Sequence, residues 1–292
     1  MLIAPQPAPG AMWLLDGNNL MHRYFHAAPV EMQDGRQVQA VRGLARLIQR
    51  IRAQYEPERI GVFFDDSRES YSGRRDLLPT YKITRTAIAR DLSTQIELAY
   101  EWLPAKQYSC DTIRVEGFEA DDVITTLALS TRTAGYSVYL VTSDKDMHAL
   151  ISDDHPRVAV YNRATGKGAE GWRLYEEADV LARFGVRPNR LLDMLALAGD
   201  AADNIPGVPG VGAKTAAELI TQYGSLEVLL GVISTVKRDA LRRALREHAA
   251  AIRLARRVLE PVSVPPDLIV KSIRHAVIKT SPTRSASAPP RP

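Results

Sequence analysis

Three short apolar segments, each followed within two residues by an acid, constrain the fold of this chain most strongly. The segments are residues 12–15, 60–64 and 137–142, and their composition suits buried strands. Helical patterns separate them, which favours a parallel α/β sheet whose ligand site lies at the carboxyl ends of the strands. We therefore expect the acids that follow them to meet at one edge of the sheet. In chain order these are Asp16, then Asp65 and Asp66, then Asp144 and Asp146.

A further acidic group opens a predicted helix. In residues 117–128 apolar side chains recur at helical spacing, and Gly117 marks a chain reversal ahead of them. Acids in a first turn stabilise an ordinary surface helix by roughly 0.3–1 kcal/mol each, so this segment alone is also compatible with a well-capped helix. Three carboxylates crowd the turn, Glu119, Asp121 and Asp122, and two more, Asp200 and Asp203, follow a later apolar helical run.

Nine acids are thus candidate metal ligands: Asp16, Asp65, Glu119, Asp121, Asp122, Asp144, Asp146, Asp200 and Asp203. Like charges cannot stay ionised together without strong compensation. Mg²⁺ or Mn²⁺ can provide it, because both prefer oxygen ligands. Two such ions side by side are a standard arrangement for hydrolysing a phosphodiester, since they activate water and neutralise charge in the transition state. The acids therefore predict metal-dependent phosphoryl chemistry.

The composition narrows the class of protein. The 292 residues, 45% of them apolar, predict one main domain and a smaller one. The single cysteine, Cys110, excludes a disulfide framework and fits a reducing cytoplasm. A net charge of +4, with nine acids gathered at one site, leaves a basic surface that suits a polyanionic substrate. No apolar run is long enough to span a membrane, and residues 1–11 and 280–292 are expected to be disordered tails.

Three further segments favour contact with nucleic acid. In residues 66–91 basic side chains alternate with Tyr71 and Tyr81, a pattern suited to a nucleic-acid strand or to a solvated loop. Residues 205–216 place glycines ahead of a helix, where backbone N–H groups can bind phosphate, although a tight structural turn needs glycine too. Residues 237–257 carry eight basic residues beside an apolar stripe, which is either a solvated face or a phosphate-binding surface. The glycines are Gly207, Gly210 and Gly212.

An ordered set of motifs resembles the 5′ nuclease family. The motifs are Asp16-Gly-x-x-Leu20-x-x-Arg23-x-Phe25-His26-Ala27, Phe64-Asp65, Leu78-Pro79-x-Tyr81-Lys82-x-x-Arg85, Glu119-Ala-Asp-Asp122, Thr142-Ser-Asp-Lys-Asp146 and Gly199-Asp200-x-x-Asp203-Asn204. This family includes the N-terminal nuclease domain of bacterial DNA polymerase I, phage 5′ exonucleases, Exonuclease IX and the flap endonucleases. The whole set is specific, although any one motif is weak.

The resemblance implies a fold and a role for each matched residue. It implies a PIN-like α/β nuclease core over residues 12–190 with a helical arch at about 66–92, then a helix-hairpin-helix (H3TH) DNA-binding region over 191–262. By this resemblance, Asp16, Asp65, Glu119, Asp121 and Asp144 surround the catalytic metal ions, whereas Asp122, Asp146, Asp200 and Asp203 are ligands of a more loosely held ion or partners of its ligands. Lys82 and Arg85 would contact the scissile phosphate and Tyr81 a terminal base, while Arg23, Arg74, Lys214 and Thr215 would bind DNA together with the three glycines.

The function implied is a stand-alone, cytoplasmic 5′-3′ exonuclease or flap endonuclease that uses Mg²⁺, with Mn²⁺ as a substitute and K⁺ at the glycine hairpin. Its partners would be 5′ ends, flaps or branched DNA, and RNA–DNA hybrids, with functional coupling to a DNA polymerase and ligase, and it would act as a monomer. A haloacid-dehalogenase-type phosphatase is disfavoured because it needs a second aspartate where this chain has Asn18. The remaining alternative is a non-catalytic protein that binds branched DNA.

Overall fold

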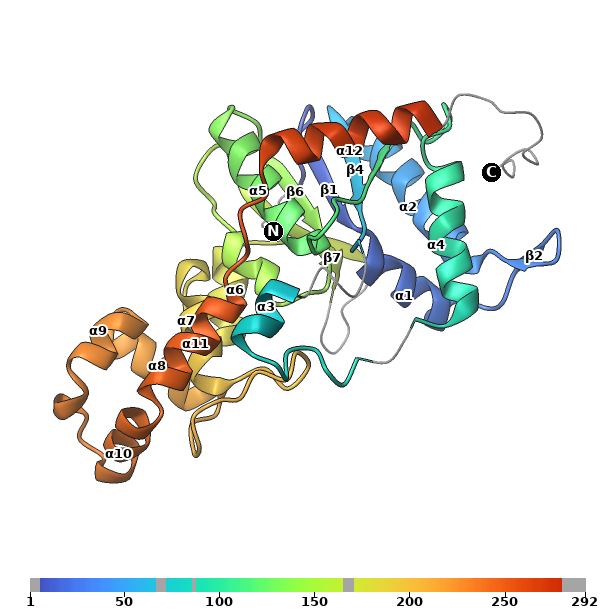
Figure 1. Ribbon diagram of the computed structural model, residues 1–292. Helices are drawn as coiled ribbons and strands as arrows, with labels where there is room; N and C mark the ends of the chain where they lie inside the picture. Colours follow the sequence, from blue (N-terminus) through green and yellow to red (C-terminus); the bar gives the residue numbers. More distant parts are fainter. Residues whose placement is uncertain (1–5, 67–71, 86–87, 165–170, 280–292) are drawn as a thin grey trace.

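A six-stranded sheet forms the centre of the computed structural model, which describes residues 6–66, 72–85, 88–164 and 171–279 (Figure 1). The strand order is β5-β4-β1-β6-β7-β8, and only β8 runs antiparallel to its neighbour. The three predicted strands are confirmed as parallel neighbours at its centre. The strands are β1 (Met12–Asp16), β4 (Arg59–Phe63), β5 (Asp111–Ile113), β6 (Val138–Val141), β7 (Val158–Arg163) and β8 (Trp172–Tyr175).

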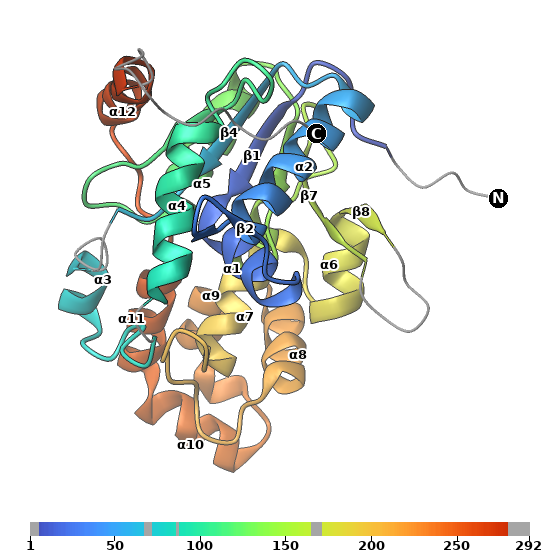
Figure 2. The ribbon, with the colours of Figure 1, turned by 90° about the vertical axis from the view of Figure 1, so that its right-hand side faces the viewer.

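Helices cover both faces of this sheet. Because successive side chains of a strand point to opposite faces, Trp13 and Leu15 of β1 join one apolar cluster and Leu14 joins the other. The first cluster packs under α1 (Gly17–Ala27), α2 (Gln39–Tyr55) and α4 (Arg90–Trp102), which lie in front of the sheet in Figure 2. The second packs under α5 (Ala120–Thr133), the helix predicted from residues 117–128. A short hairpin, β2 (Met32–Gln33) and β3 (Arg36–Gln37), precedes α2.

Beyond β8 the described chain is helical, and this helical region shares the core on the α5 side, because its apolar residues belong to the same cluster as those of α5. Helix α12 was not predicted from the two short apolar runs beyond residue 261. The elements are η2 (Asp146–Leu150), α6 (Glu177–Phe184), η3 (Pro188–Arg190), α7 (Leu191–Ala198), α8 (Ala213–Tyr223), α9 (Leu226–Gly231), η4 (Ile233–Thr235), α10 (Asp239–Glu247), α11 (Ala249–Leu259) and α12 (Pro266–Lys279).

Two connections tie this helical region to the sheet edge where the acids lie. Helix α3 (Ser72–Leu77) packs on α11, and the Arg74 Nε donates to the Val258 carbonyl oxygen at 3.1 Å. The segment from α11 to α12 crosses α5, where the Val262 N–H donates to Asp122 Oδ1 at 2.7 Å. It then leads to α12, which lies beside β5. Among the described helices, none has the length and apolar content needed to cross a membrane.

Candidate metal centre and catalytic cleft

The acids that end β1 and follow β4 are fixed by hydrogen bonds. Asp16 caps α1, because its Oδ1 accepts from the Asn19 N–H at 3.0 Å, and its Oδ2 accepts from the Thr142 hydroxyl at 2.9 Å. Burial raises the pKa of Asp16 to about 7. Asp65 accepts from the Ala120 N–H at 2.8 Å and from the Asn18 side chain at 2.7 Å. Both carboxylates therefore lie at the carboxyl edge of the sheet, as predicted.

This edge depends on the close approach of α1 to β4. A Cβ on Gly17 would lie 2.6 Å from the Phe64 ring and 2.7 Å from the Phe63 carbonyl oxygen, so only glycine fits. The register of β1 and β4 places Asp16 opposite Phe63, two residues before Asp65. Sequence and topology together thus bring the two acids side by side.

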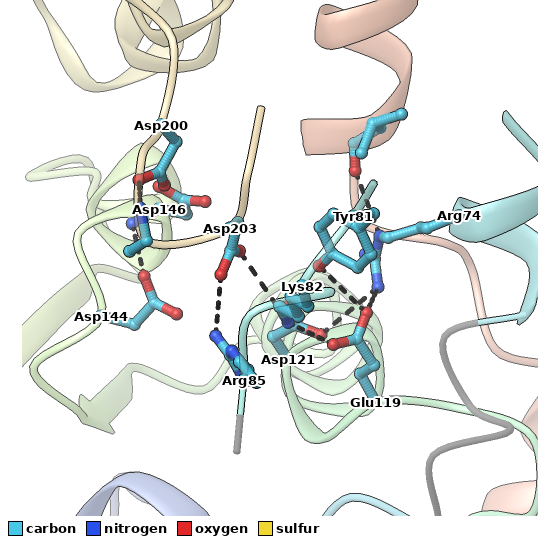
Figure 3. Close-up of polar contacts among 12 residues, drawn as sticks. Arg74, Tyr81, Lys82, Arg85, Glu119, Asp121, Asp144, Asp146, Asp200 and Asp203 are labelled. Carbon is cyan, nitrogen blue, oxygen red and sulfur yellow. Dashed lines mark hydrogen bonds and ion pairs between the residues drawn. The ribbon is translucent and has the colours of Figure 1, made fainter. Parts of the chain in front are cut away.

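Glu119 is the N-cap of α5 and the focus of a buried network (Figure 3). Its carboxylate pairs with Arg74 and Lys82 and accepts from the Tyr81 hydroxyl at 3.2 Å. Burial, aided by repulsion from Asp121, raises the pKa of Glu119 to about 7 despite these cations. Burial makes the Glu119 carboxylate costly to ionise, and the two cations in contact with it compensate the charge of its ionised form.

Protein donors from three parts of the chain hold the Asp122 carboxylate, and they occupy both of its oxygens. The Arg74 guanidinium donates to them at 2.6 and 3.1 Å, and the Val262 N–H donates to Oδ1. The Glu119 N–H completes a capping box at 3.4 Å. Burial and the neighbouring Asp121 raise the pKa of Asp122 to about 6. This carboxylate therefore joins α3, α5 and the segment before α12.

A second acidic group lies across the site, where Asp146, Asp200 and Asp203 bring one oxygen each within 4.8 Å of one another. Lys145 pairs with Asp200 at 2.8 Å and Arg85 with Asp203 at 2.8 Å. Burial raises the pKa of Asp146, with repulsion from Asp144 and Asp200 adding to it. A like-charged, desolvated group of this kind needs cations, which the two basic side chains supply only in part.

The residues present fit divalent metal ions. Glu119, Asp121 and Asp122 form a similar group, again with one oxygen each within 4.8 Å. Asp121 Oδ1 and Asp146 Oδ1 are buried and have no hydrogen-bond partner in the described part of the chain. Unsatisfied carboxylate oxygens among further carboxylates are the donor set that Mg²⁺ and Mn²⁺ prefer.

A cleft of about 1140 Å³ is lined by five of the nine candidate metal ligands and by four basic side chains, two of which are the predicted phosphate contacts. Its floor holds Asp16, Asp65, Glu119, Asp121 and Asp144, and Lys82 and Arg85 line it as well. Exposed Ile83 and Ile88 contribute apolar surface to its wall. The cleft therefore offers carboxylates for metal ions and cations for a phosphate within one space.

Three predicted DNA contacts occupy more enclosed positions than the sequence suggested. Arg74 and Tyr81 are only 6% and 3% exposed, and Lys82 Nζ lies 4.9 Å from the centre of the Tyr81 ring. Arg23 donates to the Asn162 side chain at 2.9 Å and lies over the Trp172 ring. In this conformation Arg74 neutralises acids and the Tyr81 ring is enclosed, so neither side chain lies open to DNA.

In the glycine hairpin, residues 205–212, one glycine packs against the protein and two lie in open space. A Cβ on Gly207 would lie 2.2 Å from the Ala198 carbonyl oxygen, so this glycine packs against the end of α7. Gly210 has a positive φ of 75° and lies in the open turn. Gly212 caps α8, whose exposed Lys214 and half-buried Thr215 follow. The hairpin thus combines a tightly packed turn at Gly207 with an exposed helix start at Gly212, and phosphate binding at that helix start stays a prediction.

Sequence reasoning missed the residues that hold the acids in place. Asn18 fixes Asp65, and the Asn19 side chain accepts from the Ser143 N–H at 3.1 Å and from its hydroxyl. Lys145 neutralises Asp200. The sequence did carry a signal for them, because each lies within three residues of a predicted acid that ends or follows a strand.

The fold and the site together define a PIN-like α/β core with an acid-lined edge, joined to a helical region. Residues 11–185 match the family described as 5′-3′ exonuclease, N-terminal resolvase-like domain, and residues 186–268 match the 5′-3′ exonuclease, C-terminal SAM fold. The chain therefore belongs to the 5′-3′ exonuclease family, which confirms the family and the fold class that the motifs predicted.

Individual relatives agree with this assignment. DNA polymerase I of Rhizobium leguminosarum is 34% identical over 267 residues, which cover 88% of this chain and 25% of the relative. The chain thus spans about a quarter of that protein's length. T5 5′-exonuclease with bound zinc has a TM-score of 0.72 at 20% identity, covering 92% of this chain and 99% of that chain. A variant of the bacteriophage T5 flap endonuclease, in a pseudo-enzyme-product complex with DNA and metal ions, has a TM-score of 0.67 at 20% identity, covering 93% and 99%. At these identities the structural likeness shows the fold.

Proposed function

We propose that this chain is a metal-dependent 5′-3′ exonuclease and flap endonuclease acting on DNA. The observation that carries the proposal is the cleft, which five of the nine candidate metal ligands and four basic side chains line together. Family membership supports it. A non-catalytic protein that binds branched DNA would not need this density of buried carboxylates, because each one raises the cost of folding without a metal ion.

The chain's own groups have distinct tasks in this proposal. Asp16, Asp65, Glu119, Asp121 and Asp144 would hold catalytic Mg²⁺, for which Mn²⁺ can substitute, and Asp146, Asp200 and Asp203 would hold a looser ion. When bound, these ions supply water activation and charge neutralisation. Asp122, which the Arg74 guanidinium and the Val262 N–H hold, would position Arg74 and Glu119 as a partner of the metal ligands. Lys82 and Arg85 would exchange their carboxylate partners for oxygens of the scissile phosphate and stabilise its charge.

Outside the cleft, the protein would bind DNA through its phosphates and would not recognise the base sequence. The start of α8, with Gly210, Gly212, Lys214 and Thr215, presents backbone and side-chain donors suited to phosphates, and hairpin carbonyls would hold K⁺. Arg23, Arg74 and Tyr81 would reach DNA only after rearrangement of the enclosed positions described above.

The cellular setting follows from the same proposal. Substrates would be 5′ ends, flaps and branched duplexes, including RNA–DNA hybrids, during DNA replication or repair, and the work would be coupled to a polymerase and ligase. We place this activity in the cytoplasm, in a monomer.

Cleavage of a 5′-flap DNA labelled on the flap tests the proposal. We expect wild type to release flap products with Mg²⁺ and none with EDTA, and Asp144→Ala to bind the DNA without cutting it. Asp154→Ala is the matched control, because its side chain is 91% exposed and lies outside the cleft. Tight binding by wild type with no cutting in Mg²⁺ or Mn²⁺ would instead support the non-catalytic DNA-binding protein.

A further inference from the structure

A second cavity, of about 270 Å³, adjoins the catalytic cleft. We call it the back chamber; α5, η2, η3, α7 and α11 enclose it. Exposed residues form its outer rim, among them Leu129, Asn189 and Glu260, and the acids Asp121, Asp146 and Asp203 lie at its inner end. The chamber therefore leads from the surface of the molecule to the acids.

Three buried polar atoms in the wall of the chamber have no hydrogen-bond partner among the described residues. Thr125, 7% exposed, has a buried hydroxyl with no hydrogen-bond partner among the described residues, and the same holds for Asp121 Oδ1 and Asp146 Oδ1. Arg74 Nη1 lies 3.9 Å from Asp121 Oδ1, too far for a hydrogen bond. Buried polar atoms of this kind are satisfied by water. The chamber has room for on the order of ten waters, more than the about six that hydrate a Mg²⁺ ion.

The chamber and the cleft reach different acids. Asp16, Asp65, Glu119 and Asp144 line the cleft, Asp146 and Asp203 line the chamber, and Asp121 lines both. Lys82 and Arg85 face the cleft, whereas Arg74 and Tyr81 face the chamber. The segment that carries these four residues therefore separates the two spaces, and all four are drawn with Asp146 and Asp203 in Figure 3.

We propose that the back chamber is a solvent route by which water and hydrated divalent cations reach Asp121, Asp146 and Asp203 while DNA fills the cleft. The inference rests on the proposed function, because it needs a nucleic acid that covers the cleft. A route at the back allows ions to exchange without release of the DNA. Its mixed lining, with acids inside and leucines at the rim, suits passage of hydrated cations better than retention of an apolar ligand.

Blocking the rim tests the route. Leu129 is 51% exposed on α5 and takes no part in the catalytic groups, so Leu129→Trp narrows the chamber from its mouth without stressing the core. Leu192→Trp narrows it from the opposite wall on α7. Leu181→Trp is the matched control, because Leu181 is 50% exposed on α6 and lines neither space.

The measurement is Mn²⁺ uptake by stopped flow, with a fluorescent indicator of free Mn²⁺, using the full chain alone and bound to a flap DNA whose scissile linkage resists hydrolysis. We expect both chamber variants to take up Mn²⁺ at the wild-type rate when alone. With DNA bound, uptake should be slower than wild type by about tenfold or more, because an apolar constriction excludes hydrated ions. The control variant should match wild type in both states.

Two results would overturn the route. Equal uptake by the chamber variants and Leu181→Trp with DNA bound would show that ions enter elsewhere. Equal slowing with and without DNA would show that the substitutions damage the acids themselves. Failure of the proposed function is distinct, because wild type would then take up no Mn²⁺ or leave a cleavable flap intact.

Discussion

At the scale of single residues, buried cations hold the acids together. Arg74 is 6% exposed and contacts both Glu119 and Asp122, so it compensates charge that water cannot reach. Removing one partner of a buried ion pair leaves the charge of the other partner uncompensated. The resulting loss of folding free energy exceeds the net contribution of the intact pair. The residue that the sequence assigned to DNA contact therefore has a structural task in this conformation.

We expect Arg74→Gln to lower the free energy of unfolding by about 3 kcal/mol in EDTA, with a smaller loss in saturating Mg²⁺, because a metal ion then compensates Glu119. Urea denaturation in both conditions measures this. Arg46→Gln is the control, since Arg46 pairs with Glu31 at an exposed position and should cost less than about 1 kcal/mol. An equal loss from both variants would contradict the structural task.

The raised pKa of Asp16 predicts how stability depends on pH without metal ions. Its pKa rises from 3.8 to about 7 on folding, so the folded state binds this proton more tightly than the unfolded state. Asp16 therefore favours folding below pH about 4, and that contribution is lost as pH rises to 7. Mg²⁺ competes with the proton, so the rise in Tm on adding Mg²⁺ should be larger at pH 8 than at pH 5.5.

Thermal unfolding at the two pH values, with and without Mg²⁺, checks this. Asp16→Asn should reduce the difference between the Mg²⁺-induced rises in Tm at the two pH values, because an amide does not titrate and attracts the ion less than a carboxylate does. A Mg²⁺ effect that is equal at both pH values in wild type would show that these protons and metal ions do not compete.

At the scale of elements, the sequence predicts structure that local interactions determine and misses structure that depends on contacts between residues far apart in the chain. The strands at 12–15, 60–64 and 137–142 were predictable because a local apolar run encodes each one, and parallel pairing then gathers the acids that follow. The burial of Arg74 was not, because its contact with Val258 joins residues 184 apart. Helix α12 was missed for a similar reason, since long-range bonds from Val262 and Val264 to α5 fix the segment before it.

The local glycine pattern of the hairpin does not reveal that Gly207 packs against α7, whereas Gly212 does not. We expect Gly207→Ala to lower the free energy of unfolding by about 1–3 kcal/mol, because the added methyl group would overlap the Ala198 backbone at the end of α7. Gly212→Ala meets open space and should stay within about 0.5 kcal/mol of wild type. Chemical denaturation of both variants distinguishes a glycine needed for packing from one in open space. Matching losses would mean that the hairpin relaxes away from α7.

At the scale of the whole molecule, charge is divided between the carboxyl edge of the sheet and the rest of the surface. The net charge is +4 although the site gathers nine acids. Cations that neutralise phosphates release counterions, so binding of DNA should weaken steeply as salt rises. Lys214 is exposed at the start of α8, where the helix N-terminus adds to its attraction for a phosphate.

We therefore expect Lys214→Ala to weaken binding of flap DNA to a similar extent for different sequences and to reduce the slope of log affinity against log salt by about 1. Arg59→Ala is the matched control. Arg59 begins β4, at the end of the sheet opposite the acids, and its side chain is 55% exposed. Its loss removes the same charge from the molecule but no proposed phosphate contact. Fluorescence anisotropy across a series of NaCl concentrations measures both slopes. If the two variants shift the slope equally, net charge rather than the α8 contact governs binding, and the assignment of Lys214 fails.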